Sequence, residues 1–315
     1  MGMHVPKIGI TALVPPELIF ASGNEPLDVN NVIPESRKHP KNKLCAWTAI
    51  WKEMLVNRET AIDSLIVVAG GDCHNALVDG QKVAMSGIPT HFFFYPFDGD
   101  PVFMESQLNR LTGFLGGMES PEKLKDIAGL KKLGKEIDSK RCRGKIASKD
   151  AFNILISFSD LSGDLNKFRR VIESADKTTI QQNNRVALLG VPPIYHDFHE
   201  IAETLGISIV FDELPYEFVR HGGNDIGEIA LDYCDYTFAR PLDFRIDFLQ
   251  KELEKRKVDG VVHYTQFACH HVLEDEILRA ELDYPVLTIQ GDLPGNTPEQ
   301  VRLRLEAFRE MLEKL

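Results

Sequence analysis

The chain has 315 residues, of which 43% are hydrophobic and 26% are charged, so it is long enough to form two hydrophobic cores. Its formal net charge is −11, and an acidic surface repels phosphate backbones, so we expect no nucleic-acid partner. No run of about 18 apolar residues occurs, which predicts no transmembrane helix and no membrane partner. Pro15 and Pro16 interrupt the partly apolar start and no basic segment precedes it, so we expect no signal peptide and a cytoplasmic protein.

Short β-branched runs alternate with amphipathic segments along the chain, which is typical of parallel βαβ units. In chain order, the expected strands are Lys7–Leu13, Leu65–Ala69, His91–Tyr95, Val186–Leu189, Ser208–Phe211, Val261–Tyr264 and Val286–Ile289. The expected helices are Ala46–Val56, Val102–Phe114, His196–Leu205, Arg245–Lys255, His271–Glu281 and Pro298–Leu315. The charge-rich residues 120–177 are predicted to be helical, with a polar linker from Lys177 to Asn184. We therefore predict an α/β fold in two domains, residues 1–178 with a helical connector and residues 179–315.

The two halves resemble each other when the sequence is shifted by 196 positions without gaps, a shift that places Cys73 on Cys269. The identical pairs under this shift are Asp63 and Asp259, Cys73 and Cys269, His74 and His270, and Pro89 and Pro285. Apolar runs before each cysteine and after each proline also coincide. We therefore predict two copies of one α/β unit, each with a Cys-His pair between a strand and a helix.

The positions of three of the five cysteines indicate a shared site. Cys73 and Cys269 are expected at strand ends and helix starts, where open parallel sheets bind ligands and where a thiolate is favoured. Facing copies would bring both into one cleft, and Cys45, which opens the amphipathic segment CAWTAIWKEML, would complete a group of three. Zinc sites usually use close pairs such as C-x2-C, which are absent here, whereas distant loops can hold an iron–sulfur cluster. Position alone leaves a cluster, a zinc site and inert buried thiols as alternatives, with Cys142 and Cys234 outside the group.

The histidines beside these cysteines have several interpretations. His74, His270 and His271 would serve as ligands, as proton donors, or as helix-start residues facing solvent. The repeated Cys-His pair favours His74 and His270 over His271 for moving protons near a bound cluster. Asp212–Glu213 at a strand end would be an acid–base pair or, as the plainer interpretation, a solvated strand end. No P-loop and no G-x-G-x-x-G after the first strand occur, so we expect neither ATP hydrolysis by this chain nor a nicotinamide cofactor.

Six segments carry a family resemblance in a fixed order. They are VPPELIFASGNEPLDV, CAWTAIWKEML, VVAGGDCHNALVDG, RVALLGVPPIYHDFHEIAETLGISIVFDEL, RPLDFRIDFLQKELEKRKVDGVVHYTQFACHHVLEDEIL and PVLTIQGDLPGNTPEQVRLRLEAFREML. Together they resemble the D-component family of 2-hydroxyacyl-CoA dehydratases, which includes benzoyl-CoA reductase cluster subunits and double-cubane cluster proteins. Within them, Cys45, Cys73 and Cys269 resemble the family's three ligand cysteines.

This resemblance implies two flavodoxin-like subdomains with a [4Fe–4S] cluster held between them by Cys45, Cys73 and Cys269. It implies a dimer with an identical or homologous cluster-bearing subunit and a separate ATP-dependent activator, consistent with the missing P-loop. The implied reaction is one-electron reduction of a CoA thioester, followed by loss of water from a ketyl radical. A low-potential aryl-CoA reductase subunit of the benzoyl-CoA type and a non-catalytic electron-transfer or scaffold subunit are the alternatives.

Overall fold

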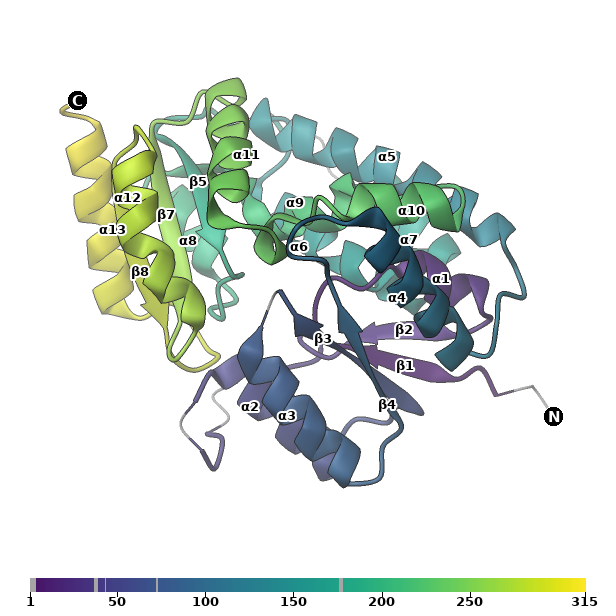
Figure 1. The fold of residues 1–315 in the computed structure, drawn as a ribbon. Coiled ribbons are helices and arrows are strands. Elements are labelled where there is room, and N and C mark those ends of the chain that lie inside the picture. The colour runs from purple at the N-terminus through teal and green to yellow at the C-terminus, as the bar shows by residue number, and fades with distance from the viewer. Residues whose placement is uncertain (1–3, 37–38, 43, 72, 176–177) are drawn as a thin grey trace.

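The computed structural model describes residues 4–36, 39–42, 44–71, 73–175 and 178–315. Within these residues the chain forms two four-stranded parallel sheets, with strand orders β2-β1-β3-β4 and β6-β5-β7-β8. The strands are β1 Lys7–Ile10, β2 Glu25–Asp28, β3 Ser64–Gly70, β4 Thr90–Phe94, β5 Arg185–Gly190, β6 Ser208–Asp212, β7 Gly260–Gln266 and β8 Val286–Gly291. The predicted α/β fold with two parallel-sheet subdomains is confirmed (Figure 1).

Helices flank both sheets and connect them. The α-helices are α1 Pro16–Ala21, α2 Ala46–Val56, α3 His74–Met85, α4 Pro101–Phe114, α5 Glu122–Cys142, α6 Ser148–Ile156, α7 Leu165–Glu173, α8 Phe198–Thr204, α9 Glu213–Arg220, α10 Ile226–Tyr233, α11 Leu242–Lys255, α12 Asp275–Glu281 and α13 Glu299–Leu312. The 3₁₀ helices are η1 Ser157–Ser159, η2 Leu161–Gly163, η3 Thr237–Ala239 and η4 His270–Glu274. The predicted helix at His271–Glu281 is therefore divided into η4 and α12.

All seven predicted strands are present, but the structure has one strand more. The first strand ends at Ile10, three residues earlier than predicted. The additional strand β2 has the sequence EPLD, whose proline and two acidic residues disfavour a strand. It lies at the edge of its sheet and pairs with β1 alone, which is where proline is tolerated.

The two halves have the same strand order and contain equivalent hydrogen bonds. Asp63 accepts a backbone hydrogen bond from Lys7 through its carboxylate at 2.7 Å, and Asp259 accepts the same bond from Arg185 at 2.7 Å. Leu65 pairs with Thr90 in the first sheet, and Val261 pairs with Val286 in the second. Each residue of the second pair lies 196 positions after its counterpart in the first pair, so β7 corresponds to β3 and β8 corresponds to β4. The repeat in the sequence thus corresponds to a repeated sheet.

The strand β3 shows why the first sheet is covered on both faces. Its sequence SLIVVAG is apolar on both sides, as is usual for a central parallel strand. Leu65 and Val67 pack under α2 and α3, whereas Ile66 and Val68 belong to the core shared with α1 and α4. A Cβ atom at Gly80 of α3 would lie 2.6 Å from a methyl carbon of Val67, so this glycine lets the helix approach the sheet closely.

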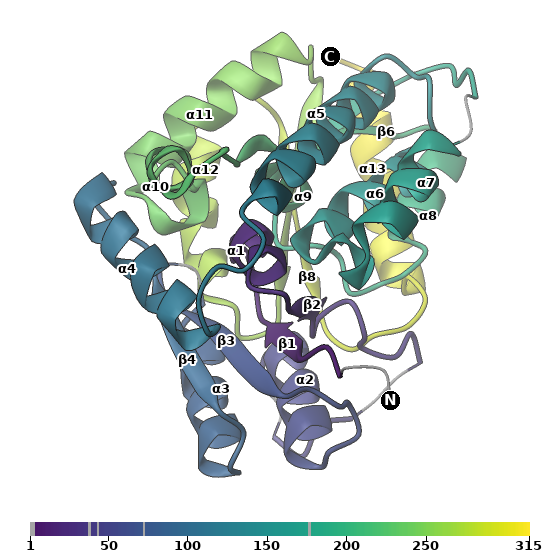
Figure 2. The ribbon, with the colours of Figure 1, turned by 90° about the vertical axis from the view of Figure 1, so that its right-hand side faces the viewer.

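Helices between the sheets join the halves into one packed unit. The predicted helical region forms α5, α6, η1, η2 and α7. Figure 2 shows α5 running between α1 of the first half and β6 of the second. From the second half, α9 packs on α5 and α10 packs on α4, so residues of both halves share one hydrophobic core. The domain boundary at 178/179 stays a prediction. Of the helices that the structure describes, none is both long and apolar enough to cross a bilayer.

Candidate functional site

The three cysteines of the predicted group each lie immediately before a helix. Cys45 precedes α2, Cys73 precedes α3 and Cys269 precedes η4. β3 ends at Gly70 and β7 ends at Gln266, so Cys73 and Cys269 lie at equivalent places beyond the carboxyl ends of their strands. The Cys73 sulfur accepts a hydrogen bond from the Ala76 N–H at 3.4 Å. Free N–H groups and the dipole at the starts of α2 and α3 favour negative charge on a sulfur there.

A strained turn positions Cys269. Its N–H donates to the Gln266 carbonyl at 2.9 Å, which closes a turn between β7 and η4. Ala268 in this turn has a φ of 60°, a left-handed conformation that glycine adopts more readily than alanine. The Ala268 carbonyl accepts a hydrogen bond at 3.0 Å from Asn75 Nδ2 in the other half. The opposite half therefore helps to hold the backbone that presents Cys269.

The two repeated Cys-His segments meet in space. The rings of His74 and His270 lie edge to face with their centroids 5.6 Å apart. Beside them, Gly71 has a φ of 89°, and a Cβ atom there would lie 2.7 Å from the Cβ of Ala239. Only a residue without a side chain permits this approach. This contact between the two histidines agrees with the prediction that the facing copies bring their Cys-His loops together.

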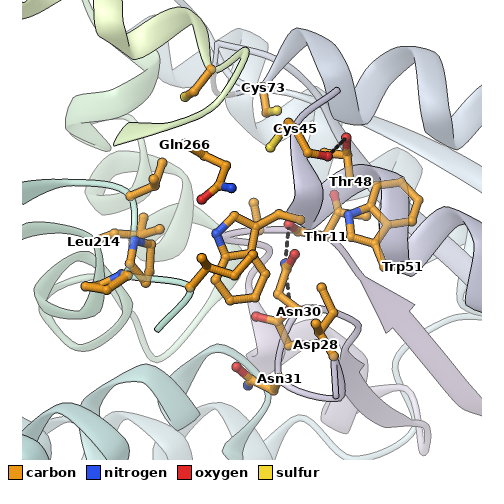
Figure 3. Close-up of a pocket in the computed structure, with 18 of the residues that line it drawn as sticks. Thr11, Asp28, Asn30, Asn31, Cys45, Thr48, Trp51, Cys73, Leu214 and Gln266 are labelled. Atoms are coloured by element: carbon orange, nitrogen blue, oxygen red, sulfur yellow. Dashed lines mark hydrogen bonds between the residues drawn. The ribbon is translucent and has the colours of Figure 1, made fainter. Parts of the chain in front are cut away.

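A cavity of about 260 Å³ lies where these loops meet, and Cys45, Cys73 and Cys269 all contribute to its wall. Figure 3 shows the side chains of Cys45 and Cys73 toward one end of the cavity, with Asp28 and Asn31 toward the other. Cys45 and Cys269 are close enough for the charge of one to raise the pKa of the other. The three thiols thus come from three separate segments and line one cavity.

The sequence model of one known family, 2-hydroxyglutaryl-CoA dehydratase, D-component, matches residues 11–312. The chain belongs to this family. A comparison with curated proteins finds no match. Membership in the dehydratase D-component family supports a subunit of the 2-hydroxyacyl-CoA dehydratase type, an enzyme with lyase-like activity on acyl-CoA, and suggests a metal-cluster cofactor.

The chemistry of the donor set fits the metal cluster that the D-component family suggests. Burial raises the pKa of Cys45, and burial raises the pKa of Cys269 to about 12, although backbone N–H groups near each sulfur oppose the rise. Thiols in such a place become thiolates only when a cation compensates their charge. A bound iron–sulfur cluster would supply that positive charge, and thiolates are its usual ligands.

The histidines form a second group around Cys269. The possible ligand atoms of Cys269, His270 and His271 all lie within 4.8 Å of one another. His271 Nδ1 lies 2.9 Å from both carboxylate oxygens of Glu274, which also pairs with Arg245. Burial, followed by the charge of His271, lowers the pKa of His270 to about 4, so His270 is neutral at pH 7. A single metal ion on this Cys-His-His group is therefore an alternative to a cluster.

Other residues singled out in the sequence lie away from the cavity. Cys142 ends α5, with its sulfur 3.3 Å from Arg185 Nη2, and Cys234 is buried at the end of α10. Neither belongs to the cavity wall that the structure describes. The interpretation of Asp212–Glu213 as a solvated strand end was wrong, because both are 1% exposed. The reason is charge pairing: Asp212 contacts Arg141 and His199, and Glu213 contacts Arg245.

Several residues of the cavity wall were not predicted. Trp47 and Trp51, the only two tryptophans of the chain, both line it. They lie four residues apart on α2, next to Cys45, so helical spacing in CAWTAIWKEML was an available signal. Gln266 and Asp28 line the cavity from the ends of β7 and β2. Asp28 was missed because its strand was missed.

Proposed function

We propose that this chain binds a [4Fe–4S] cluster through Cys45, Cys73 and Cys269 and forms part of an enzyme that removes water from a 2-hydroxyacyl-CoA thioester. The observation that supports the proposal is the convergence of three thiols, each before a helix, on the wall of one cavity. Three protein ligands leave one iron of a cluster without a protein ligand, and such an open position is what substrate chemistry at a metal requires.

The cluster would supply a single electron of low potential to the thioester. The residues of the chain then have separate tasks. The cysteines would hold the cluster, and N–H groups at the starts of α2 and α3 would stabilise the negative charge of the thiolate sulfurs. His270 is neutral at pH 7 and lies against His74, so we propose that this pair moves a proton at the cavity wall. The apolar wall, with Trp47, Trp51 and Phe152, would exclude water.

We propose two protein partners, which the family and the sequence support. The chain has no P-loop, so a separate ATP-dependent activator would deliver the electron. We further propose an identical or homologous cluster-bearing subunit as the second member of a dimer. Since an open iron reacts with oxygen, the enzyme would work in an anaerobic cytoplasm.

Anaerobic purification tests the cluster. The protein is expected to be brown, to hold about four iron and about four acid-labile sulfide per chain, and to lose its colour in air. Stoichiometric zinc without labile sulfide would contradict the proposal and favour a single metal ion on Cys269, His270 and His271. The reaction itself is checked by adding activator, ATP, reductant and a 2-hydroxyacyl-CoA and measuring the 2-enoyl-CoA formed.

A further inference from the structure

The cavity has a second polar end, away from the cysteines. Thr11, Asp28, Asn30 and Asn31 line it there, at the carboxyl ends of β1 and β2 (Figure 3). Asn30 Nδ2 donates to the Thr11 carbonyl at 2.8 Å and to Asp28 Oδ1 at 2.9 Å. Ligands of parallel α/β sheets bind at this edge.

Asp28 is a buried carboxyl group without a cationic partner among the described residues. It is 3% exposed, and its Oδ1 accepts hydrogen bonds from the Asn30 backbone and side chain, each at 2.9 Å. The Asp160 carboxylate accepts the Asp28 N–H at 2.8 Å, so a second acidic group lies alongside. Burial and the charge of Asp160 raise the pKa of Asp28 to about 7.

The duplicated fold contains a comparison for Asp28. Asp212 is the last residue of β6, as Asp28 is the last residue of β2, and each strand is the edge strand beside β5 or β1. Asp212 pairs with Arg141 and with His199, and these partners help to lower its pKa against the effect of burial. In the second half, the Asp212 carboxylate is thus neutralised by ion pairs and packed inside the protein. In the first half, Asp28 has no described cation and lines the cavity, and such an unfavourable burial is typical of a binding site.

Two further polar atoms in the cavity wall have no partner among the described residues. They are the indole N–H of Trp47, a donor, and Oε1 of Gln266, an acceptor, and both are buried. No lysine or arginine is found among the described residues that line the cavity. A volume of about 260 Å³ is below the roughly 300–1,000 Å³ of pockets for drug-sized ligands, so the cavity suits an acyl group and not a whole coenzyme A.

We propose that Asp28 determines specificity by accepting a hydrogen bond from a donor group at the far end of the acyl chain, such as a carboxamide or hydroxyl group. This inference rests on the proposed function, because it takes the acyl group of the thioester as the occupant. A terminal carboxylate would meet Asp28, with the Asp160 carboxylate behind it, and no described cation to compensate the charge. A terminal hydrocarbon would desolvate Asp28 and add nothing to the hydrogen bonds that it already accepts from Asn30. The acyl group expected here is therefore neither glutaryl-like nor wholly apolar.

Ligand binding tests this choice without turnover. Because both tryptophans line the cavity, intrinsic fluorescence reports binding there. The probes are 4-carbamoylbutyryl-CoA, glutaryl-CoA and 5-methylhexanoyl-CoA, which have acyl groups of similar shape and lack a 2-hydroxyl group. At pH 8, the wild-type protein is expected to bind the carboxamide at least about tenfold more tightly than the other two.

Variants distinguish a binding role from a structural one. Asp28→Asn keeps the shape and offers an N–H to a carboxylate, so the preference over glutaryl-CoA is expected to fall below about threefold. Asp126→Asn, which removes an exposed charge on α5, should keep the wild-type preference. The inference is overturned if wild-type protein binds all three probes equally or binds none, or if Asp28→Asn keeps the preference.

Iron and labile sulfide are measured on the same samples, so the two proposals fail separately. A full cluster with no preference among the probes overturns the role of Asp28 alone. If the wild-type protein prefers the carboxamide probe but contains no iron, only the proposal of a bound cluster is overturned. Should Asp28→Asn fail to fold, the order of the three affinities in wild-type protein still decides the inference.

Discussion

At the scale of single residues, the cysteines that line the cavity differ from those that do not. Cys45→Ala, Cys73→Ala and Cys269→Ala are each expected to lose most of the iron, because each removes one of three protein ligands. Cys234→Ala is the matched control, since Cys234 is about as buried as Cys45 and Cys269 but packs in the core at the end of α10. Iron per chain after anaerobic purification is the measurement. Equal iron loss in Cys234→Ala would show that the ligand set is wrong.

Asp28 gives a prediction for the pH dependence of stability. Its pKa rises from 3.8 to about 7 on folding, so the folded state binds more protons than the unfolded state between these values. The free energy of unfolding should therefore fall as pH rises from about 4 to 7. The loss from this group is up to about 4 kcal/mol, at about 1.4 kcal/mol per pKa unit. Asp28→Asn should lack this loss and be more stable than wild type at pH 8.

The readout is the difference between the denaturation midpoints of wild type and Asp28→Asn at each pH. Subtraction is needed because burial lowers the pKa of His270 to about 4, which makes stability rise with pH over part of the same range. The lowered pKa of Glu217, about 2 against 4.5, makes stability rise with pH mainly below about pH 4.5, and subtraction removes this contribution as well. A difference that stays constant from pH 4 to 8 would show that Asp28 ionises normally in the folded protein.

At the scale of elements, two helical glycines should respond in opposite ways to alanine. Gly80→Ala places a Cβ 2.6 Å from a Val67 methyl carbon, and such overpacking costs about 1–3 kcal/mol and would shift α3, which begins beside Cys73. Gly113 in α4 has no atom within 4 Å of such a Cβ, so Gly113→Ala should stabilise the protein by about 0.5–1 kcal/mol. Urea denaturation measures both. Stabilisation by Gly80→Ala would mean that the contact between α3 and β3 is looser than described.

The elements that sequence patterns predicted well are those with strong local signals. β3 is a continuous apolar run and β7 contains a shorter one, and the 196-residue shift between them placed Cys73 and Cys269 correctly after their strands. β2 was missed because EPLD lacks β-branched residues and forms a strand only through its pairing with β1. Asp28, which ends that strand, could not be placed at the cavity for the same reason.

Local patterns could not predict the ion pairs of Asp212 and Glu213 either. The arginine that pairs with Asp212 is Arg141, 71 residues earlier, and the arginine that pairs with Glu213 is Arg245, 32 residues later. No periodicity connects such partners. Only the folded arrangement of α5, β6 and α11 shows that these acidic residues are buried in charge pairs.

At the scale of the whole molecule, a buried polar triad ties the halves together. Lys131 Nζ lies 2.6 Å from Glu17 Oε1 and 2.7 Å from the Tyr233 hydroxyl, and all three residues are buried. Lys131→Ala leaves the Glu17 carboxylate buried without its cation, which should cost about 3–5 kcal/mol. The exposed neighbour Lys132→Ala should change stability by less than about 0.5 kcal/mol. Similar melting temperatures for both variants would contradict this account of how α1, α5 and α10 are joined.

The claim that joins all scales is that both halves supply ligands to one cluster. Anaerobic crystals measured at the iron absorption edge test it most directly, because anomalous scattering locates iron without assumptions about the ligands. We expect iron peaks within bonding distance of the sulfurs of Cys45, Cys73 and Cys269. A single metal ion bound by Cys269, His270 and His271, with no metal on Cys45 and Cys73, would contradict it.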